Sequence, residues 1–247
     1  MEADNSPQLR GQRCNLTFGL HEILGRAIVG GDYRVRPFPT ESDLAKLHGV
    51  SRSVTREAVK MLGAKGLLAA RAGQGTFVRP IEAWSLLDTD VLRWLLEHKR
   101  SIVILRHSFE LCLAVQPAAC ALAATYATAD QLAEIRSKFE RAHAAQQNGN
   151  DFVEADIAFQ GAILNASNNP FFSKLREFVS LAILGSNRFD RTSAYYSRQI
   201  DARIALHQAI ATQHPSEAIE AMKLLLSERQ RLIEQGVKHD SYLGDEQ

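Results

Sequence analysis

The pattern of apolar positions predicts helices along most of this chain, with glycine at several of the breaks. In residues 16–29 apolar side chains recur every three or four positions, which is the spacing of one helix face. Gly30 and Gly31 end this pattern. We therefore expect a helix that begins near Leu16 and stops at Gly30.

A second helix is predicted after Thr40, whose hydroxyl can accept a hydrogen bond from the backbone at the start of a helix. Its inward face is expected to hold Leu44, Ala45 and Leu47. Gly49 follows closely, and glycine adopts the positive φ at which a helix can end in a tight turn. These residues predict a short helix followed by a sharp change of direction.

A third helix is expected over residues 52–62, with Ser51 as its cap. Helical spacing assigns its buried face to four apolar residues, Val54, Ala58, Val59 and Leu62. The same spacing leaves four polar residues pointing outward, namely Arg52, Ser53, Thr55 and Arg56. Guanidinium and hydroxyl groups donate hydrogen bonds to phosphates and to guanine edges, so the start of this helix is suited to the major groove of DNA.

Two short strand candidates, residues 67–70 and 76–78, follow the third helix and flank the turn Gly73-Gln74-Gly75. They predict a β-hairpin whose glycines let the backbone approach another surface closely. The helices, the tight turn and the hairpin together predict a winged helix-turn-helix. From the pattern alone, a small helical hairpin whose arginines only keep it soluble stays open as an alternative.

The remaining two-thirds of the chain has helical patterns without the alternation that strands produce. Its breaks fall near residues 99–100, 127–128, 148–150, 168–170, 191–193 and 214–215. The segments between them are amphipathic and number about six, which is typical of an antiparallel helical bundle. The predicted fold class is mainly α, with a winged helix-turn-helix and a small β-hairpin wing at the N-terminus and a bundle at the C-terminus.

The charges are unevenly distributed between these two parts. The formal net charge is +1, but residues 1–80 hold 12 Lys and Arg against 7 Asp and Glu, whereas residues 81–247 hold 17 against 21. The first part therefore carries +5 and the second −4. This asymmetry indicates that the N-terminal part is the one that meets a polyanion such as DNA.

The composition limits the compartment that we expect. Cys14, Cys112 and Cys120 are odd in number and lack CxxC spacing, so neither a disulfide framework nor a zinc knuckle is indicated. The N-terminal residues lack the apolar region of a signal peptide, and we find no segment with the length and hydropathy of a membrane helix. The sequence predicts a cytoplasmic protein that contacts no membrane.

Two motifs in the first third carry a family resemblance: Thr40-Glu41-x-x-Leu44-Ala45-x-x-x-Gly49-Val50-Ser51-Arg52-x-x-x-Arg56-Glu57-Ala58-Val59 and Gly73-x-Gly75-Thr76-Phe77-Val78. This part resembles the DNA-binding domain of the GntR family of bacterial transcription regulators. The resemblance implies a DNA-contacting set of Thr40, Glu41, Arg52, Ser53, Arg56, Gly73 and Gln74. Ser42 stands where the family often has arginine, so one DNA contact is expected to be missing or moved.

Further motifs lie in the second part: Leu86-Leu87-Asp88-Thr89-Asp90-Val91-Leu92-x-Trp94-Leu95-Leu96, Glu154-Ala155-Asp156-Ile157-x-Phe159 and Asn169-Pro170. They are similar to the FadR subfamily, and within it to sugar-acid-responsive members such as galactonate repressors. This resemblance implies an all-helical domain that binds an effector and forms a homodimer. The predicted parts are a flexible N-terminus (1–15), the winged helix-turn-helix (16–80), a connecting segment (81–100), the effector-binding and dimerisation domain (101–236) and a flexible tail (237–247).

The effector domain of this subfamily commonly buries a divalent metal held by an aspartate and three histidines. Asp156 matches the aspartate, but the positions implied for the histidines hold Gln160, Arg203 and Leu225. An amide is a poor metal ligand, and guanidinium and isobutyl groups are not ligands, so no cofactor is expected. A displaced divalent-metal site that uses Asp156 and His207 stays open as an alternative.

The resemblance also implies an arginine and a glutamate one turn apart in the pocket, where this chain has Cys112 and Gln116. The implied effector-binding set is then Cys112, Gln116, Asp156, Gln160, Arg203 and His207. Arg203 keeps its charge and offers a planar fork of donors, which suits the carboxylate of a ligand. A salt bridge between Arg203 and Asp156 across the bundle is the other role that the sequence leaves open.

These features predict a ligand-responsive transcription regulator that binds palindromic double-stranded operator DNA as a homodimer. We expect a repressor of a catabolic operon that is released by a small carboxylate such as a sugar acid. Two alternatives stay open: an enzyme that uses Asp156 and His207, and a helical scaffold whose N-terminal part binds a protein. The sequence has no nucleophile-base arrangement, phosphate-binding loop or GxGxxG motif that would favour an enzyme.

Overall fold

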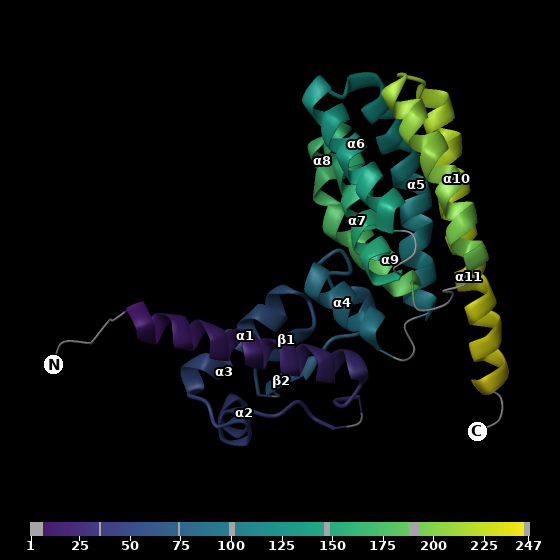
Figure 1. The fold of residues 1–247 in the computed structure, drawn as a ribbon. Helices are drawn as coiled ribbons and strands as arrows, with labels where there is room; N and C mark the ends of the chain where they lie inside the picture. The colour runs from purple at the N-terminus through teal and green to yellow at the C-terminus, as the bar shows by residue number, and fades with distance from the viewer. Residues whose placement is uncertain are drawn as a thin grey trace. The chain divides into compact units, whose positions relative to one another are not determined.

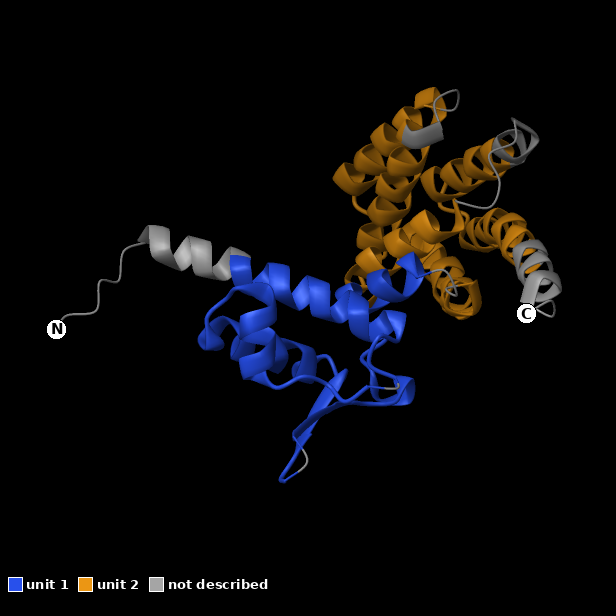
Figure 2. Cartoon of the chain, turned by 90° about the horizontal axis from the view of Figure 1, so that it is seen from below, with its two compact units in different colours: residues 1–98 blue, residues 99–247 orange. Residues whose placement is uncertain are grey.

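The computed structural model describes residues 7–34, 36–73, 75–98, 102–145, 149–187 and 193–244. The chain forms two compact units, residues 1–98 (unit 1) and residues 99–247 (unit 2), which Figure 2 shows in different colours. The boundary between the two units, after residue 98, falls inside the predicted connecting segment (81–100). Unit 1 contains the predicted winged helix-turn-helix, and unit 2 contains the predicted helical bundle, which confirms the mainly α fold class.

The described part of unit 1 consists of α-helices and a two-stranded sheet, labelled in Figure 1, and a short 3₁₀ helix. In chain order these elements are α1 (Pro7–Gly30), α2 (Glu41–His48), α3 (Arg52–Ala64), β1 (Leu68–Arg71), β2 (Gly75–Val78), the 3₁₀ helix Ile81–Ala83 and α4 (Thr89–Glu97). Helix α1 begins well before the start that the sequence predicts near Leu16.

The turn between α2 and α3 follows the predicted local chemistry. The Oγ1 atom of Thr40 accepts a hydrogen bond from the backbone N of Asp43 at 3.2 Å and thereby caps α2. Gly49 ends this helix with a φ of 63°, which is a left-handed conformation that favours glycine. The Oγ atom of Ser51 then accepts from the backbone N of Val54 at 3.3 Å and caps α3.

Two side chains in this region lie differently from the prediction. Leu47, predicted to face inward, is 72% exposed because Leu44 and Ala45 are the buried residues of α2. At roughly 100° per residue, Leu47 lies about 110° from the centre of that buried face. Thr55, predicted to point outward, is buried, and its hydroxyl donates to the backbone oxygen of Ser51 at 3.3 Å. The outward face of α3 is therefore narrower than the sequence predicts.

The strands β1 and β2 form the predicted hairpin. They pair antiparallel, with Leu68 opposite Val78 and Arg71 opposite Gly75. The chain then returns to the end of α3, where Gly66 has a φ of +80° and a β-carbon would stand 2.3 Å from the backbone oxygen of Ala83. Glycine at this position is therefore required by both the backbone conformation and the close approach of the chain.

Helix α4, which lies in the predicted connecting segment, packs on α1 within unit 1. Its apolar face holds the predicted anchors Leu92, Leu95 and Leu96, together with Val91 and Trp94. The indole of Trp94 covers α1 at Gly25, a position where a β-carbon would stand 2.3 Å from Trp94 Cη2.

Ion pairs join α4 to α1 and to the C-terminal end of α3. Arg93 donates to both carboxylate oxygens of Glu22, at 2.6 and 2.8 Å, and to Asp90 at 2.9 Å. Lys65, which follows the last residue of α3, donates to Asp88 at 2.7 and 2.8 Å and lies 2.9 Å from a carboxylate oxygen of Asp90. We call these five residues the unit 1 ion-pair network.

Unit 2 is a helical bundle in its described residues (Figure 1). Its helices are α5 (Ile102–Tyr126), α6 (Ala129–Ala144), α7 (Gly149–Ala166), α8 (Pro170–Lys174), α9 (Arg176–Ser186), α10 (Ser193–Ala211) and α11 (Pro215–Gly244). The breaks near residues 127–128, 168–170 and 214–215 fall where the sequence predicts them, whereas those predicted near 99–100, 148–150 and 191–193 lie wholly or partly outside the described residues. The predicted segment between residues 170 and 191 holds both α8 and α9. A capping box at the start of α6 joins Thr128 and Gln131.

Helix α5 corrects one expectation from the sequence. By length and composition, Ile102–Tyr126 is a candidate membrane span. Half of its most apolar stretch is buried inside the protein, however, and the helix contacts α7, α9, α10 and α11. A helix surrounded on several sides by other helices is expected to be apolar on most of its surface, so α5 has the pattern of a central core helix.

Candidate DNA-binding surface and buried polar cluster

Arg52, Ser53 and Arg56, the predicted DNA-contacting residues of α3, are all exposed. Arg52 Nη2 donates to Ser42 Oγ at 3.3 Å. Ser42 is the position where the related family often has arginine. In this chain the Arg52 guanidinium therefore lies next to the position from which the family's arginine side chain would extend. We propose that Arg52 covers part of the DNA surface that the missing arginine would contact.

The other predicted DNA contacts lie at the start of α2 and at the tip of the hairpin. The Thr40 hydroxyl donates to Asp43 Oδ2 at 2.6 Å, so its first role is to hold the start of α2, where Glu41 is half-buried. Gly73 is exposed with a φ of +76°, and no atom lies within 4 Å of the place of a β-carbon. Gln74 lies outside the described residues. The DNA contacts of these residues stay predictions.

A cluster of charged and amide side chains lies inside unit 2, centred on the fully buried carboxylate of Asp156 in α7. Arg203 Nε, from α10, donates to Asp156 Oδ1 at 2.6 Å, and Arg229 Nη2, from α11, donates to Asp156 Oδ2. Both guanidinium groups are buried as well. Three helices, α7, α10 and α11, are therefore joined through one carboxylate.

Amide side chains extend this cluster on two sides. Gln160 donates to Asp156 at 2.9 Å and accepts from Gln116 of α5 at 2.6 Å. On the other side, Arg203 Nη1 donates to the backbone oxygen of Gln199 at 2.8 Å, and Arg203 Nη2 donates to the side-chain oxygen of Gln199 at 3.2 Å. We call Gln116, Asp156, Gln160, Gln199, Arg203 and Arg229 the buried polar cluster.

The ring of Phe152 covers the Arg203 guanidinium, whose carbon lies 4.5 Å from the ring centroid. Burial alone would raise the pKa of Asp156, but the charges and hydrogen bonds of Arg203 and Arg229 hold that pKa well below its usual value. Asp156 is therefore a carboxylate at neutral pH. Burial raises the pKa of the Cys112 thiol to about 12, although the positive charge of Arg229 acts in the opposite direction.

The structure brings together most of the predicted effector-binding residues. Gln116, Asp156, Gln160 and Arg203 belong to the buried polar cluster, and Cys112 lies within electrostatic reach of Arg229. His207 has a different environment, because its ring stacks on Phe139 at a centroid distance of 4.4 Å. Of the two roles predicted for Arg203, the salt bridge to Asp156 is present.

Arg229 and Gln199 are the members of the cluster that the sequence analysis missed. Gln199 stands one helical turn before Arg203 in α10, and Arg229 stands one turn after Leu225 in α11. Residues four positions apart lie on the same face of a helix. Both therefore lie on the helix faces that positions 203 and 225 mark, which is the one signal in the sequence that points to them.

These donors do not fit a divalent metal. The carboxylate of Asp156 is engaged by two guanidinium groups and an amide, and guanidinium groups repel cations. His207, the partner of Asp156 in the alternative metal site, has Phe139 against its ring, and burial and the charge of Arg136 lower its pKa. In the side chains that can be described, we find no group of three or more His, Cys, Asp or Glu placed to hold a metal ion.

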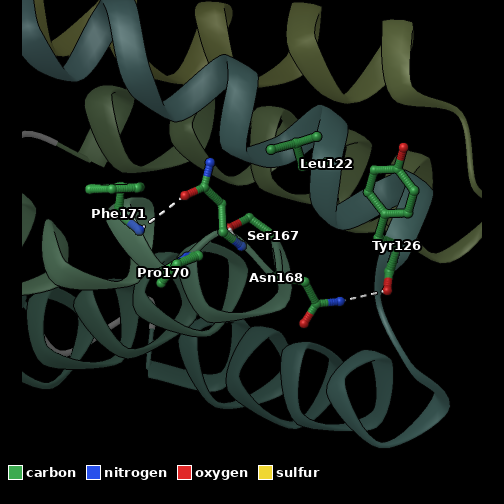
Figure 3. Close-up of a pocket in the computed structure, with 7 residues that line it drawn as sticks. Leu122, Tyr126, Ser167, Asn168, Pro170 and Phe171 are labelled. Carbon is green, nitrogen blue, oxygen red and sulfur yellow. Dashed lines mark hydrogen bonds between the residues drawn. The ribbon is translucent and has the colours of Figure 1, made fainter.

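Unit 2 also has an open surface hollow of about 650 Å³, shown in Figure 3. It is lined by Leu122, Tyr126, Ser167, Asn168, Asn169, Pro170 and Phe171. Asn168 Nδ2 donates to the backbone oxygen of Tyr126 at 2.7 Å, and Asn169 Oδ1 accepts from the backbone N of Phe171 at 2.9 Å. The lining contains no charged side chain, so this hollow is a poor match for a charged ligand.

The fold and these two sites define a DNA-binding transcription regulator with a helical effector domain. Residues 20–78 match the family of bacterial regulatory proteins called the gntR family, and residues 107–228 match the FCD domain. The chain belongs to the GntR family and carries an FCD domain as its C-terminal part. This family consists of transcription regulators and not of enzymes, so the enzyme alternative is set aside.

Named relatives agree with this assignment. The chain is 33% identical over 217 residues to the galactonate operon transcriptional repressor of Escherichia coli (strain K12), covering 85% of this chain and 94% of that protein. It is 35% identical over 180 residues to the HTH-type transcriptional regulator YieP of the same organism, covering 72% of this chain and 76% of the relative.

Solved structures share the fold. A protein called Lar, which controls the expression of the Listeria monocytogenes agr system, matches with a TM-score of 0.58 at 16% identity, covering 89% of this chain and 96% of that one. A GntR protein of Streptococcus agalactiae matches with a TM-score of 0.51 at 24% identity, covering 87% and 99%. At these identities the likeness shows the fold alone.

Proposed function

We propose that this regulator is a cytoplasmic homodimer that represses a catabolic operon and is released from its operator by a small carboxylate such as a sugar acid. The observation that carries this proposal is the pair of buried guanidinium groups, Arg203 and Arg229, in the FCD domain. A carboxylate is the natural partner of such groups, because it accepts charge-assisted hydrogen bonds from them. The name of the galactonate repressor relative supports the choice of a sugar acid.

The polar side chains around these arginines also suit a hydroxylated ligand. Gln116, Gln160 and Gln199 each have an amide that can donate and accept hydrogen bonds. The hydroxyl groups of a sugar acid need both kinds of partner. An effector that competes with Asp156 for either guanidinium would change how α7, α10 and α11 are joined, and we propose this as the start of the response.

In the DNA-binding domain we propose that Arg52 and Arg56 read the operator. Both are exposed on the outward face of α3, and neither takes part in the apolar core. We expect Arg52→Ala and Arg56→Ala each to lose about 1–3 kcal/mol of operator discrimination. The measurement is a fluorescence anisotropy titration of the full chain with operator and with unrelated duplex at the same salt concentration.

The matched control for this experiment is Arg141→Ala. This change removes the same charge from an exposed ion pair of α6, far from the recognition helix in the sequence. We expect it to leave operator affinity close to that of the wild type. Equal operator affinity for wild type, Arg52→Ala and Arg56→Ala would contradict the assignment of α3 as the recognition helix.

A further inference from the structure

A groove of about 340 Å³ lies on unit 2, with walls from α6, α7 and α9. Its lining in α7 includes Ile157, Ala158 and Gly161. Asp156 and Gln160 of the buried polar cluster point in another direction, because at about 100° per residue they lie roughly 130° around the same helix. The groove is therefore a separate site from the buried polar cluster.

Gly161 gives the side chain of Arg176 a place against α7. A β-carbon at residue 161 would stand 3.0 Å from Arg176 Cδ and 3.2 Å from Arg176 Cγ. Glycine is less favourable than alanine inside a helix, and Gly161 lies inside α7. The room that Arg176 occupies is a physical reason for glycine at this position. The stem of Arg176, which comes from α9, thus lies against α7 where it lines the groove.

Four polar side chains that line this groove have no partner among the described residues. Glu134, Lys138, Asn165 and Arg176 each take part in no side-chain hydrogen bond or ion pair within that part of the chain. A charged group that its own chain leaves unpaired can bind a ligand without first breaking an internal contact. The groove thus offers one carboxylate, one amide and two cations to a ligand.

Two hydrogen bonds between side chains fix how α6 lies along α7. Gln131 donates to Asn168, just after the end of α7, at 2.9 Å. Arg141, near the end of α6, donates to Glu154, near the start of α7, at 3.0 Å. The two helices therefore run antiparallel, and residues between these contacts face each other in reverse order.

This arrangement sets the order of the charges along the groove. Between the two contacts, Glu134 is level with about residue 164 of α7 and Lys138 with about residue 158, while Arg176 lies at residue 161. At about 1.5 Å of rise per residue, neighbouring levels are roughly 4.5 Å apart. A carboxylate at one end of the groove is therefore followed by two cations.

We propose that this groove binds a small amino acid whose ammonium and carboxylate groups are both free. The carboxylate of the ligand accepts charge-assisted hydrogen bonds from Arg176 and Lys138. Its ammonium group donates to Glu134 and to the amide oxygen of Asn165. A ligand with only one of these charged groups uses only one end of the groove. This site is additional to the effector site of the proposed function and does not depend on it.

The test compares amino acids of increasing length with compounds that lack one charged group. The amino acids are glycine, β-alanine, γ-aminobutyrate and δ-aminovalerate. Each is paired with the carboxylate and the amine of the same carbon chain, as γ-aminobutyrate is with butyrate and propylamine. Calorimetric titration of the full-length protein measures the affinities. We expect the best amino acid to bind at least about tenfold more tightly than either of its controls.

Substitutions on both sides of the groove test the assignment of residues. Arg176→Gln and Glu134→Gln should each weaken binding of the best amino acid at least about tenfold. Both residues are exposed, so the fold should be retained, which circular dichroism checks. The matched control is Arg136→Gln, which removes the same charge from an exposed pair with Glu140 on α6, outside the groove lining. It should bind as the wild type does.

Gly161→Ala separates positioning from stability. The new methyl group displaces the stem of Arg176, so binding should weaken by about fivefold or more. The melting temperature should not fall, because the exposed Arg176 side chain can move and alanine favours the helix. A purely structural role for this glycine would produce the opposite result, a less stable protein with unchanged ligand affinity.

The inference would be overturned if no amino acid bound more tightly than its matched carboxylate and amine. Folded Arg176→Gln and Glu134→Gln proteins that bind like the wild type would also overturn it. Arg203→Gln distinguishes this groove from the buried polar cluster and should keep the wild-type affinity for the amino acid. A loss of binding in Arg203→Gln but not in Arg176→Gln would move the ligand to the cluster and contradict the inference, whereas the proposed function is tested separately by release of operator DNA.

Discussion

Gly25 of α1 lies under the indole of Trp94 of α4. The two helices can pack this closely only because residue 25 has no β-carbon. A β-carbon would stand 2.3 Å from Trp94 Cη2 and 2.4 Å from Cζ3. We expect Gly25→Ala to destabilise unit 1 by about 1–3 kcal/mol, the usual effect of overpacking. Gly19→Ala is the matched control, because no atom lies within 4 Å of the new methyl group. It should stabilise α1 by about 0.5–1 kcal/mol, since alanine favours a helix more than glycine does.

The fluorescence of tryptophan during urea denaturation measures this pair of changes. Both tryptophans of the chain, Trp84 and Trp94, lie in residues 1–98, so the signal reports the unfolding of unit 1. A Gly25→Ala protein as stable as the wild type would contradict the close packing of α4 on α1.

Arg203 and Arg229 show how far single residues could be predicted from the sequence. Arg203 was found because the family resemblance assigns a ligand position to it, and its chemistry then pointed to a carboxylate. Arg229 stands at no such position, and an arginine within an amphipathic helical pattern is usually solvent-exposed. Its burial depends on α7 and α10 presenting Asp156 to α11, which is a tertiary contact that the sequence of α11 alone cannot reveal.

At the scale of elements, the unit 1 ion-pair network fixes α4 against α1 and the end of α3. The hydrogen bonds of Arg93 lower the pKa of Glu22 from 4.5 to about 2, against the opposing effect of burial. A carboxylate with a lowered pKa stabilises the folded state above its unfolded pKa, and that contribution is lost as the pH falls toward the folded pKa. The contribution of Glu22 is therefore present at neutral pH and disappears between pH 4.5 and about 2.

We expect Glu22→Gln to be less stable than the wild type at neutral pH, by up to about 1 kcal/mol because the pair is partly exposed. The difference should shrink as the pH is lowered through the interval given by the two pKa values. Urea denaturation followed by tryptophan fluorescence at a series of pH values measures it. Glu57→Gln is the control within the same unit, since Glu57 is 59% exposed and pairs with an exposed lysine, and it should have almost no effect. A difference for Glu22→Gln that grows on acidification would contradict this role of Arg93.

Elements were predicted best where local chemistry determines them. The caps Thr40 and Ser51 and the left-handed Gly49 each act within a few residues of the chain, and all three are confirmed. Leu47 and Thr55 were placed on the wrong faces because the buried side of a short helix depends on its neighbours. The long apolar pattern of α5 likewise fits two environments, and only its contacts with other helices distinguish a core helix from a membrane span.

In the whole molecule, DNA binding and effector binding are assigned to separate units. Unit 1 carries the exposed arginines of the recognition helix, and unit 2 carries the buried polar cluster. If a ligand binds more tightly to the free protein than to the DNA-bound protein, its binding lowers the affinity of the protein for the operator by the same factor. The central claim is that a carboxylate bound at Arg203 weakens operator binding.

The most direct test measures operator affinity of the full-length protein by fluorescence anisotropy, with and without a saturating monocarboxylate effector and with a chelator present throughout. Arg203→Gln is compared with the wild type, because the amide keeps a hydrogen-bond donor near Asp156 while it removes the charge. We expect the effector to weaken operator binding of the wild type by about fivefold or more, the usual range of allosteric coupling. Arg203→Gln should still bind the operator but show almost no response to the same effector concentration. An Arg203→Gln protein that is released as readily as the wild type, or a wild type whose response is abolished by the chelator, would contradict the account.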